Sequence, residues 1–104
     1  MSGWMGVDLD GTLAFYDGWN GGVIGGPIFP MINRVKEWRK RGTEVRIFTA
    51  RASVPEMIPL VEEWCNAHIG EVLPVTNIKD FGMVELWDDI AVQVVPNTDK
   101  RVSE

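Results

Sequence analysis

One stretch of this chain decides its fold: Trp4-Met5-Gly6-Val7-Asp8-Leu9-Asp10-Gly11-Thr12-Leu13. Side chains alternate along a β-strand, so Asp8 and Asp10 share one side at the end of a predicted strand, and Gly11 lets the backbone turn away. Two carboxylates this close repel each other unless a cation or a shared proton offsets their charge. The stretch therefore predicts a strand that leads into a cation site, although a solvated turn with an Asx cap could carry the same Asp-Leu-Asp-Gly sequence.

Length and composition limit the rest of the molecule. The 104 residues suffice for one domain, residues 1–104, and leave no room for an inserted second domain. The chain is 45% hydrophobic and 24% charged, as in an ordinary globular protein, and it has no window of the apolar length of a membrane span. It shows no secretion signal, and Cys65 is its only cysteine. We therefore expect a cytoplasmic protein in which Cys65 is a buried thiol.

The net charge of −5 argues against nonspecific binding to nucleic acid, because Lys and Arg are the residues that hold a phosphate backbone. The basic residues gather over residues 34–41, around the end of a predicted helix, where cations complement the helix dipole. The acidic balance favours a metal cation as a partner.

Glycines and prolines divide the chain into alternating strands and helices. We expect strands over residues 4–8, 43–49, 72–76, 83–87 and 91–95, and helices over residues 30–41 and 53–69. Such alternation predicts an α/β domain with a mainly parallel sheet flanked by helices. The Gly-rich segment Phe15–Pro27 predicts a β-hairpin flap, since five glycines and a proline oppose a helix.

Several local signals refine this prediction. Ser53-Val54-Pro55-Glu56 has the pattern of a capping box, and Pro59 is expected to confine the first turn of the helix to a separate short piece. His68 lies at the end of that helix, where we expect it to cap a carbonyl or to pack against the core. The link over residues 77–82 is too short for a helical crossover, so the third strand should be rudimentary or this region irregular.

The carboxyl ends of parallel strands are where ligands of open α/β sheets bind. In this chain the predicted ends carry Asp8, Asp10, Thr49, Lys79, Asp88 and Asp89. Carboxylate oxygens suit Mg²⁺, which bridges to phosphate oxygens. The Thr49 hydroxyl and the backbone N–H groups beside it, at Ala50, can bind phosphate, and Lys79 supplies a positive charge. The sequence therefore predicts a site for a divalent cation and a phosphoryl group.

These residues resemble the four motifs of the haloacid dehalogenase superfamily of aspartyl-phosphate phosphohydrolases, and the resemblance runs nearly end to end. Residues 8–12 resemble its first motif, residues 48–51 its second, residues 77–79 its third and residues 86–89 its fourth. The intervals after the first two motifs have no room for a cap domain, so the resemblance is to capless members. Residues 75–97 are similar to small phosphatases found in bacteriophage genomes.

The resemblance implies a compact Rossmann-like domain that hydrolyses a phosphomonoester with the help of Mg²⁺. It implies that Asp8 is the nucleophile and Asp10 the general acid and base. Asp8, the backbone carbonyl of Asp10, Asp88 and Asp89 would hold Mg²⁺, while Thr49, Ala50 and Lys79 would bind the phosphate. The substrate would be a nucleotide, a sugar phosphate or the phosphorylated end of a macromolecule, and a second subunit covers the open site in some capless members.

Other interpretations stay open at this point. A receiver-like module also holds an aspartyl phosphate with acidic residues, Thr and Lys, but there Lys follows the acidic residues, whereas Lys79 precedes Asp88 and Asp89. A catalytically silent member would only bind metal or phosphate. Tyr16, Trp19 and Arg51 are candidate substrate contacts, although the two aromatic rings could equally pack against the core of their own chain.

Overall fold

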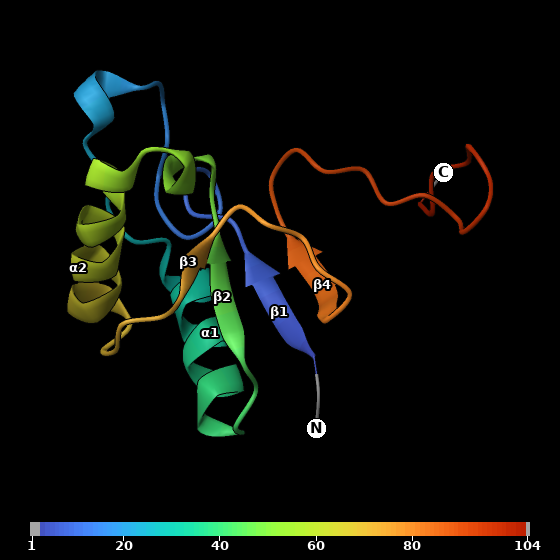
Figure 1. Cartoon of the computed structure of the whole chain (residues 1–104), viewed down its shortest axis with the longest axis horizontal. Coiled ribbons are helices and arrows are strands. Elements are labelled where there is room, and N and C mark those ends of the chain that lie inside the picture. The colour runs from blue at the N-terminus through green and yellow to red at the C-terminus, as the bar shows by residue number, and fades with distance from the viewer. Residues whose placement is uncertain (1–2, 104) are drawn as a thin grey trace.

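Four parallel strands form a sheet in the part of the chain that the computed structural model describes, residues 3–103. The strands are β1 (Trp4–Val7), β2 (Val45–Phe48), β3 (Val75–Thr76) and β4 (Met83–Trp87), in the order β3-β2-β1-β4 (Figure 1). All three neighbouring pairs are parallel. Together with two long helices, this sheet confirms the predicted α/β domain with a Rossmann-like arrangement.

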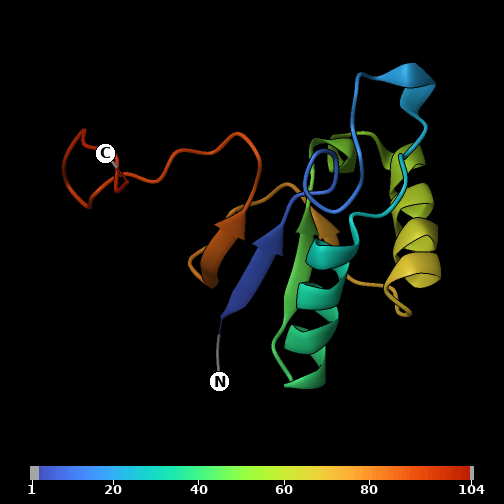
Figure 2. The same ribbon diagram turned by 180° about the vertical axis from the view of Figure 1, so that it is seen from behind.

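The helices α1 (Phe29–Lys40) and α2 (Ile58–His68) pack on the same face of the sheet, where the view from behind shows α1 lying across the strands (Figure 2). Their apolar sides and alternate strand residues form one core, which includes Val7, Leu9, Leu13, Ile32, Val35, Val45, Ile47, Val61, Cys65 and Leu73. Each such side chain contributes about 1.5–3 kcal/mol by leaving water. Cys65 is fully buried, as predicted, and burial raises the pKa of its thiol to about 12. No helix in residues 3–103 has the length and apolarity that a membrane crossing requires.

The start of α2 confirms one prediction and contradicts another. Pro55–Met57 forms a separate 3₁₀ turn and α2 begins at Ile58, with Pro59 in the first turn, where a missing N–H costs no hydrogen bond. The predicted capping box is wrong, because Ser53 ends the 3₁₀ helix Ala50–Ser53 and its Oγ donates to the carbonyl of Ala50 (2.8 Å). At the other end of α2, His68 packs on Trp64 with the ring centroids 4.6 Å apart.

The short link between β3 and β4 crosses the second face of the sheet, in front of β2 and β1 (Figure 1). Six extended residues reach about 20 Å, whereas three strand spacings sum to about 14 Å, so no helix is needed. The indole N–H of Trp4 donates to Asp80 (2.7 Å), and the Arg46 guanidinium lies 4.4 Å from the centre of the Trp4 ring. These contacts hold the crossing segment, residues 77–82, against the sheet, and β3 is reduced to two residues.

The Gly-rich segment does not form the predicted β-hairpin. An antiparallel bridge between Ala14 and Pro27 closes its base, and its far end is a 3₁₀ turn at Asn20–Gly22. Gly21 and Gly22 have φ of 69° and 85°, in the left-handed region, which interrupts any ladder of paired strands. We call residues 15–27 the flap loop.

The predicted strand over residues 91–95 is also wrong. The carboxylate of Asp88 accepts hydrogen bonds from the backbone N–H groups of Ile90 (3.2 Å) and Ala91 (2.9 Å). The resulting turn leads the chain away from the sheet, and the following residues form an arm that projects from the domain, with one bridge between Val94 and Arg101 (Figure 1).

Candidate active site

The carboxyl ends of β1, β2 and β4 open into one pocket with a volume of about 580 Å³. Its lining consists of Asp8, Asp10, Tyr16, Trp19, Phe48, Thr49, Ala50, Arg51, Val54, Met57, Leu86, Asp88, Asp89 and Ile90. The strands converge because the N–H of Asp8 donates to the carbonyl of Trp87 (2.9 Å), which aligns the end of β1 with the end of β4. Nearly all predicted site residues therefore meet where the topology of a parallel sheet places a ligand.

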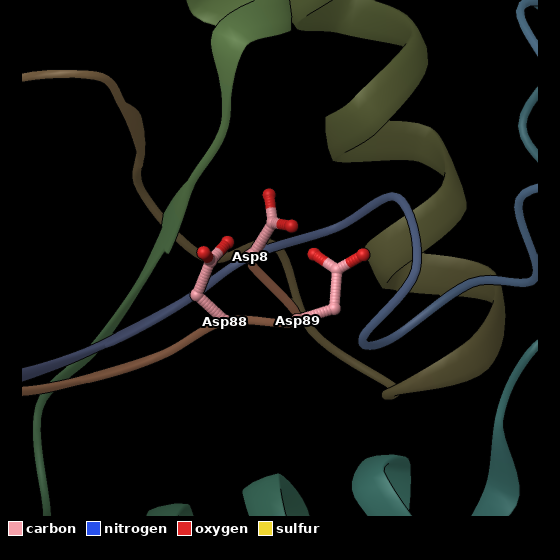
Figure 3. Close-up of side chains that lie close together, drawn as sticks. All are labelled: Asp8, Asp88 and Asp89. Atoms are coloured by element: carbon pink, nitrogen blue, oxygen red, sulfur yellow. The ribbon is translucent and has the colours of Figure 1, made fainter. Parts of the chain in front are cut away.

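Three carboxylates form the acidic part of this pocket. Oxygen atoms of Asp8, Asp88 and Asp89 lie within 4.8 Å of one another, and Figure 3 shows the three side chains gathered around one space. Asp88 is fixed by the hydrogen bonds that its carboxylate accepts from the turn after β4. The triad could hold a metal ion, and its all-oxygen donor set suits a hard divalent cation.

The pKa of Asp8 is raised to about 8. Burial is the largest cause, followed by the hydrogen bond and the negative charge of Asp88, whereas a hydrogen bond from the backbone of Leu9 acts in the opposite direction. A carboxyl group with this pKa is largely protonated at neutral pH in the metal-free protein. A divalent cation in the triad would offset the repulsion and favour the ionised form.

In the metal-free protein, we expect this raised pKa to make the stability fall with rising pH. The folded state binds the Asp8 proton more tightly than the unfolded state, where the pKa is about 3.8, so the stability that this proton contributes is lost as pH rises from about 4 through 8. Asp8→Asn should remove this dependence and raise the free energy of unfolding at pH 8 by about 2 kcal/mol, after screening by solvent is allowed for. Urea unfolding in EDTA at pH 5 and pH 8 measures the free energy of unfolding of the parent and the variant, with Asp99→Asn as the control. An equal change in parent and variant would contradict the prediction.

Gly11 makes room for the triad. Its φ of +88° lies in the left-handed region, and a Cβ at this position would collide with the carboxylate of Asp89. Leu9 and Leu13, on either side of the turn at Gly11, both point into the core and are fully buried. The Asp-Leu-Asp-Gly sequence thus supplies acidic groups to the pocket and anchors the same turn in the interior.

Asp10 lines the same pocket but is paired with Arg51 and does not belong to the triad. The guanidinium Nε and Nη2 donate to the two oxygens of Asp10 at 2.8 and 2.9 Å, and Nη1 donates to the carbonyl of Gly22 (2.6 Å). The Arg51 side chain is only 3% exposed and stacks on Trp19 at 4.9 Å. Arg51 therefore orients Asp10 and ties it to the flap loop. It also lines the pocket, and its contact with a substrate stays a prediction.

Thr49 and Ala50 lie where β2 ends, as predicted. Thr49 is 2% exposed, its N–H donates to the carbonyl of Thr76 (2.9 Å), and its hydroxyl oxygen accepts from the N–H of Arg51 (3.2 Å). Both residues line the pocket. The threonine hydroxyl proton and the N–H of Ala50 are the donors available here for a phosphate oxygen.

Lys79 is the predicted site residue that the structure leaves outside the pocket. It is exposed on the crossing segment and lines an adjoining hollow, which shares Leu86 and Asp88 with the pocket. The reason is the short link to β4, which leads the chain across the sheet immediately after β3.

The flap loop contributes both predicted aromatic side chains. Tyr16 and Trp19 line the pocket and are 48% and 50% exposed, so neither ring is buried in the core. Val54, Met57 and Ile90 also line the pocket, although no motif predicted them, and they complete the apolar part of the wall. A signal existed for Ile90, because it directly follows the acidic pair, but nothing in the sequence distinguishes Val54 and Met57 from core residues.

No protein-family model matches the chain, and neither a curated protein nor a solved structure matches it.

Proposed function

We propose that this protein is a Mg²⁺-dependent phosphatase that hydrolyses a phosphomonoester through an aspartyl-phosphate intermediate, as a capless member of the haloacid dehalogenase superfamily. The observation that carries the proposal is the different environment of the first two aspartates. Asp8 lies in the triad with Asp88 and Asp89, whereas both carboxylate oxygens of Asp10 accept hydrogen bonds from Arg51. Two carboxylates in contrasting environments are suited to a nucleophile and an acid–base group.

In the proposed reaction, an oxygen of Asp8 attacks phosphorus and the bond from phosphorus to the ester oxygen breaks. Asp10 gives its proton to the leaving oxygen. Asp10 then removes a proton from a water molecule, which attacks phosphorus, so that phosphate leaves and the Asp8 carboxylate is restored. Asp8, Asp88, Asp89 and the carbonyl of Asp10 would hold Mg²⁺, which would supply the charge that offsets repulsion between carboxylate and phosphate.

The remaining residues position the phosphoryl group. The hydroxyl of Thr49 and the N–H of Ala50 donate to its oxygens, in a partly apolar pocket where such hydrogen bonds are stronger than in water. The flap loop takes the place of a cap, and the substrate is a phosphorylated small molecule or the phosphorylated end of a macromolecule. A second copy of the chain could cover the open side of the site.

Turnover of p-nitrophenyl phosphate tests this function. We expect hydrolysis with Mg²⁺, loss of activity in EDTA, recovery when Mg²⁺ is added back, and no recovery with Ca²⁺. Ca²⁺ accepts more ligands at longer distances and can engage both oxygens of Asp8, one of which must stay free to attack. Full activity in EDTA, or equal rates with Ca²⁺, would contradict the proposal.

One observation favours a second candidate, a module that binds metal and phosphate without turnover. Lys79, which the resemblance assigns to the phosphate, lies outside the pocket. Incubation with acetyl phosphate and Mg²⁺ distinguishes the two, because a phosphatase releases phosphate continuously, whereas the receiver-like module accumulates a stable phosphoprotein.

A further inference from the structure

We propose, on the basis of the phosphatase function above, that the site selects a phosphomonoester whose leaving group is flat and uncharged, such as a nucleoside. It discriminates against substrates that carry a second phosphate or a carboxylate. This selectivity follows from the charges that line the pocket, from their existing partners and from the position of its aromatic wall.

Among the lining residues within 3–103, none offers a free cation to a second anionic group. Arg51 is the only Lys or Arg among its described lining residues, and its guanidinium is buried and hydrogen-bonded to Asp10 and Gly22. Lys79 lines the adjoining hollow together with two acidic residues, Glu85 and Asp88. A second phosphate would therefore enter without a partner for its charge.

The charge balance around the transferred phosphate leads to the same conclusion. Asp8, Asp88 and Asp89 carry three negative charges when ionised, and one divalent cation supplies two positive charges. The pair of Asp10 and Arg51 adds one positive charge while Asp10 carries the proton for the leaving oxygen and none once Asp10 is ionised, so the loaded site has no excess positive charge before the substrate binds. Direct contact with the cation offsets repulsion for one phosphoryl group, but a second anion farther away finds no cation left to pair with.

The wall of the pocket is suited to a flat apolar group. The Trp19 ring is held by the Arg51 guanidinium at 4.9 Å, and half of its surface stays exposed. Near Gly22, Trp19 lies beside Met57, since a Cβ on that glycine would be 3.3 Å from the indole and 3.5 Å from the methionine methyl group. A ring held in place before binding loses little entropy on stacking, and stacking of a base on an aromatic side chain contributes about 1–3 kcal/mol.

Three matched esters test the proposal on the full chain with Mg²⁺. We expect kcat/KM for a nucleoside 5′-monophosphate to exceed that for ribose 5-phosphate by about tenfold, because the latter lacks the base. The kcat/KM for the nucleoside 3′,5′-bisphosphate should be no higher than that for ribose 5-phosphate, because the bisphosphate carries a second anionic group. Equal kcat/KM for the monophosphate and the bisphosphate would overturn the proposal, as would preference for ribose 5-phosphate or for the phosphorylated end of an oligonucleotide.

Two variants assign the selectivity to the wall and to the charge balance. Trp19→Ala should bring the ratio of nucleotide to ribose phosphate close to one. Phe15→Ala should leave that ratio unchanged, since Phe15 is 68% exposed in the same flap loop and does not line the pocket. Val54→Arg adds a cation to the wall and should raise kcat/KM for the bisphosphate relative to that for the monophosphate. Failure of Trp19→Ala to change the ratio would overturn the stacking contact.

The controls separate this proposal from the function on which it rests. p-Nitrophenyl phosphate in the same assay reports turnover independently of selectivity, so hydrolysis of this ester with a flat profile over the three esters contradicts the selectivity alone. If no ester is hydrolysed, the proposed function fails. Calorimetric titration with Mg²⁺ then tests the selectivity as binding: tighter binding of the monophosphate than of the bisphosphate supports it, and equal affinity overturns it.

Discussion

Asp8→Asn is expected to lower turnover of p-nitrophenyl phosphate by a factor of about 10⁴ or more, because the amide cannot form the aspartyl phosphate. The fold should persist, since the change also relieves the repulsion that raises the pKa of Asp8. Steady-state rates with saturating Mg²⁺, together with circular dichroism of the purified variant, measure both effects.

The matched control for this variant is Asp99→Asn, which removes the same charge from a side chain that is 94% exposed on the projecting arm. It should keep the parent rate. Hydrolysis by Asp8→Asn within tenfold of the parent rate would rule out the aspartyl-phosphate mechanism, whatever residue replaced Asp8 as the nucleophile.

Arg51→Met is expected to lower the free energy of unfolding by about 3–5 kcal/mol, because it leaves the part-buried carboxylate of Asp10 without its partner. Arg51 is nearly inaccessible and Asp10 is only 19% exposed, so water replaces the two lost hydrogen bonds only in part. Urea unfolding measures the loss. Turnover should fall as well, since the orientation of the acid–base group depends on the same guanidinium.

The control for this prediction is Arg46→Met on the second face of the sheet. Arg46 also forms ion pairs and lies over a tryptophan, but its side chain is 29% exposed, so we expect a loss of about 1 kcal/mol. The double variant Asp10→Asn/Arg51→Met removes the unpaired charge and should recover much of the stability. Equal losses for Arg51→Met and Arg46→Met would show that burial of the Asp10 pair is unimportant.

Local signals were sufficient to predict most of the fold. β1 is an apolar run and β2 and β4 are mostly apolar segments that each contain one charged residue, and all three stop at a polar residue. The helices α1 and α2 follow from the helical spacing of their buried residues. The predicted strand over residues 91–95 failed because alternation describes which side chains could face a sheet, not whether an edge is available. The turn at Asp88 leads those residues away before they can pair.

The candidate site was predictable in composition but not in pairing. Because they lie at strand ends, four residues were correctly predicted to meet in one pocket: Asp8, Thr49, Asp88 and Asp89. The partnership of Asp10 with Arg51 joins residues 41 positions apart and depends on the path of the flap loop, which no local pattern specifies. The prediction that Lys79 lies in the pocket failed for a similar reason, since the direction of the crossing segment decides where Lys79 lies.

The acidic triad also has a consequence for how the chain holds its ends together. Asp8 precedes Asp88 by 80 positions in the sequence. The strand β4, which leads to Asp88, is one of the two edge strands and the last strand in the described part of the chain. An ion bound by both residues would act as a clip that closes most of the polypeptide into a single loop, and the chain entropy removed by such a closure grows with loop length. Edge strands separate first in local opening, so the ion would be released before the core unfolds. Ion concentration would then control the fraying of β4 separately from the melting of the helices.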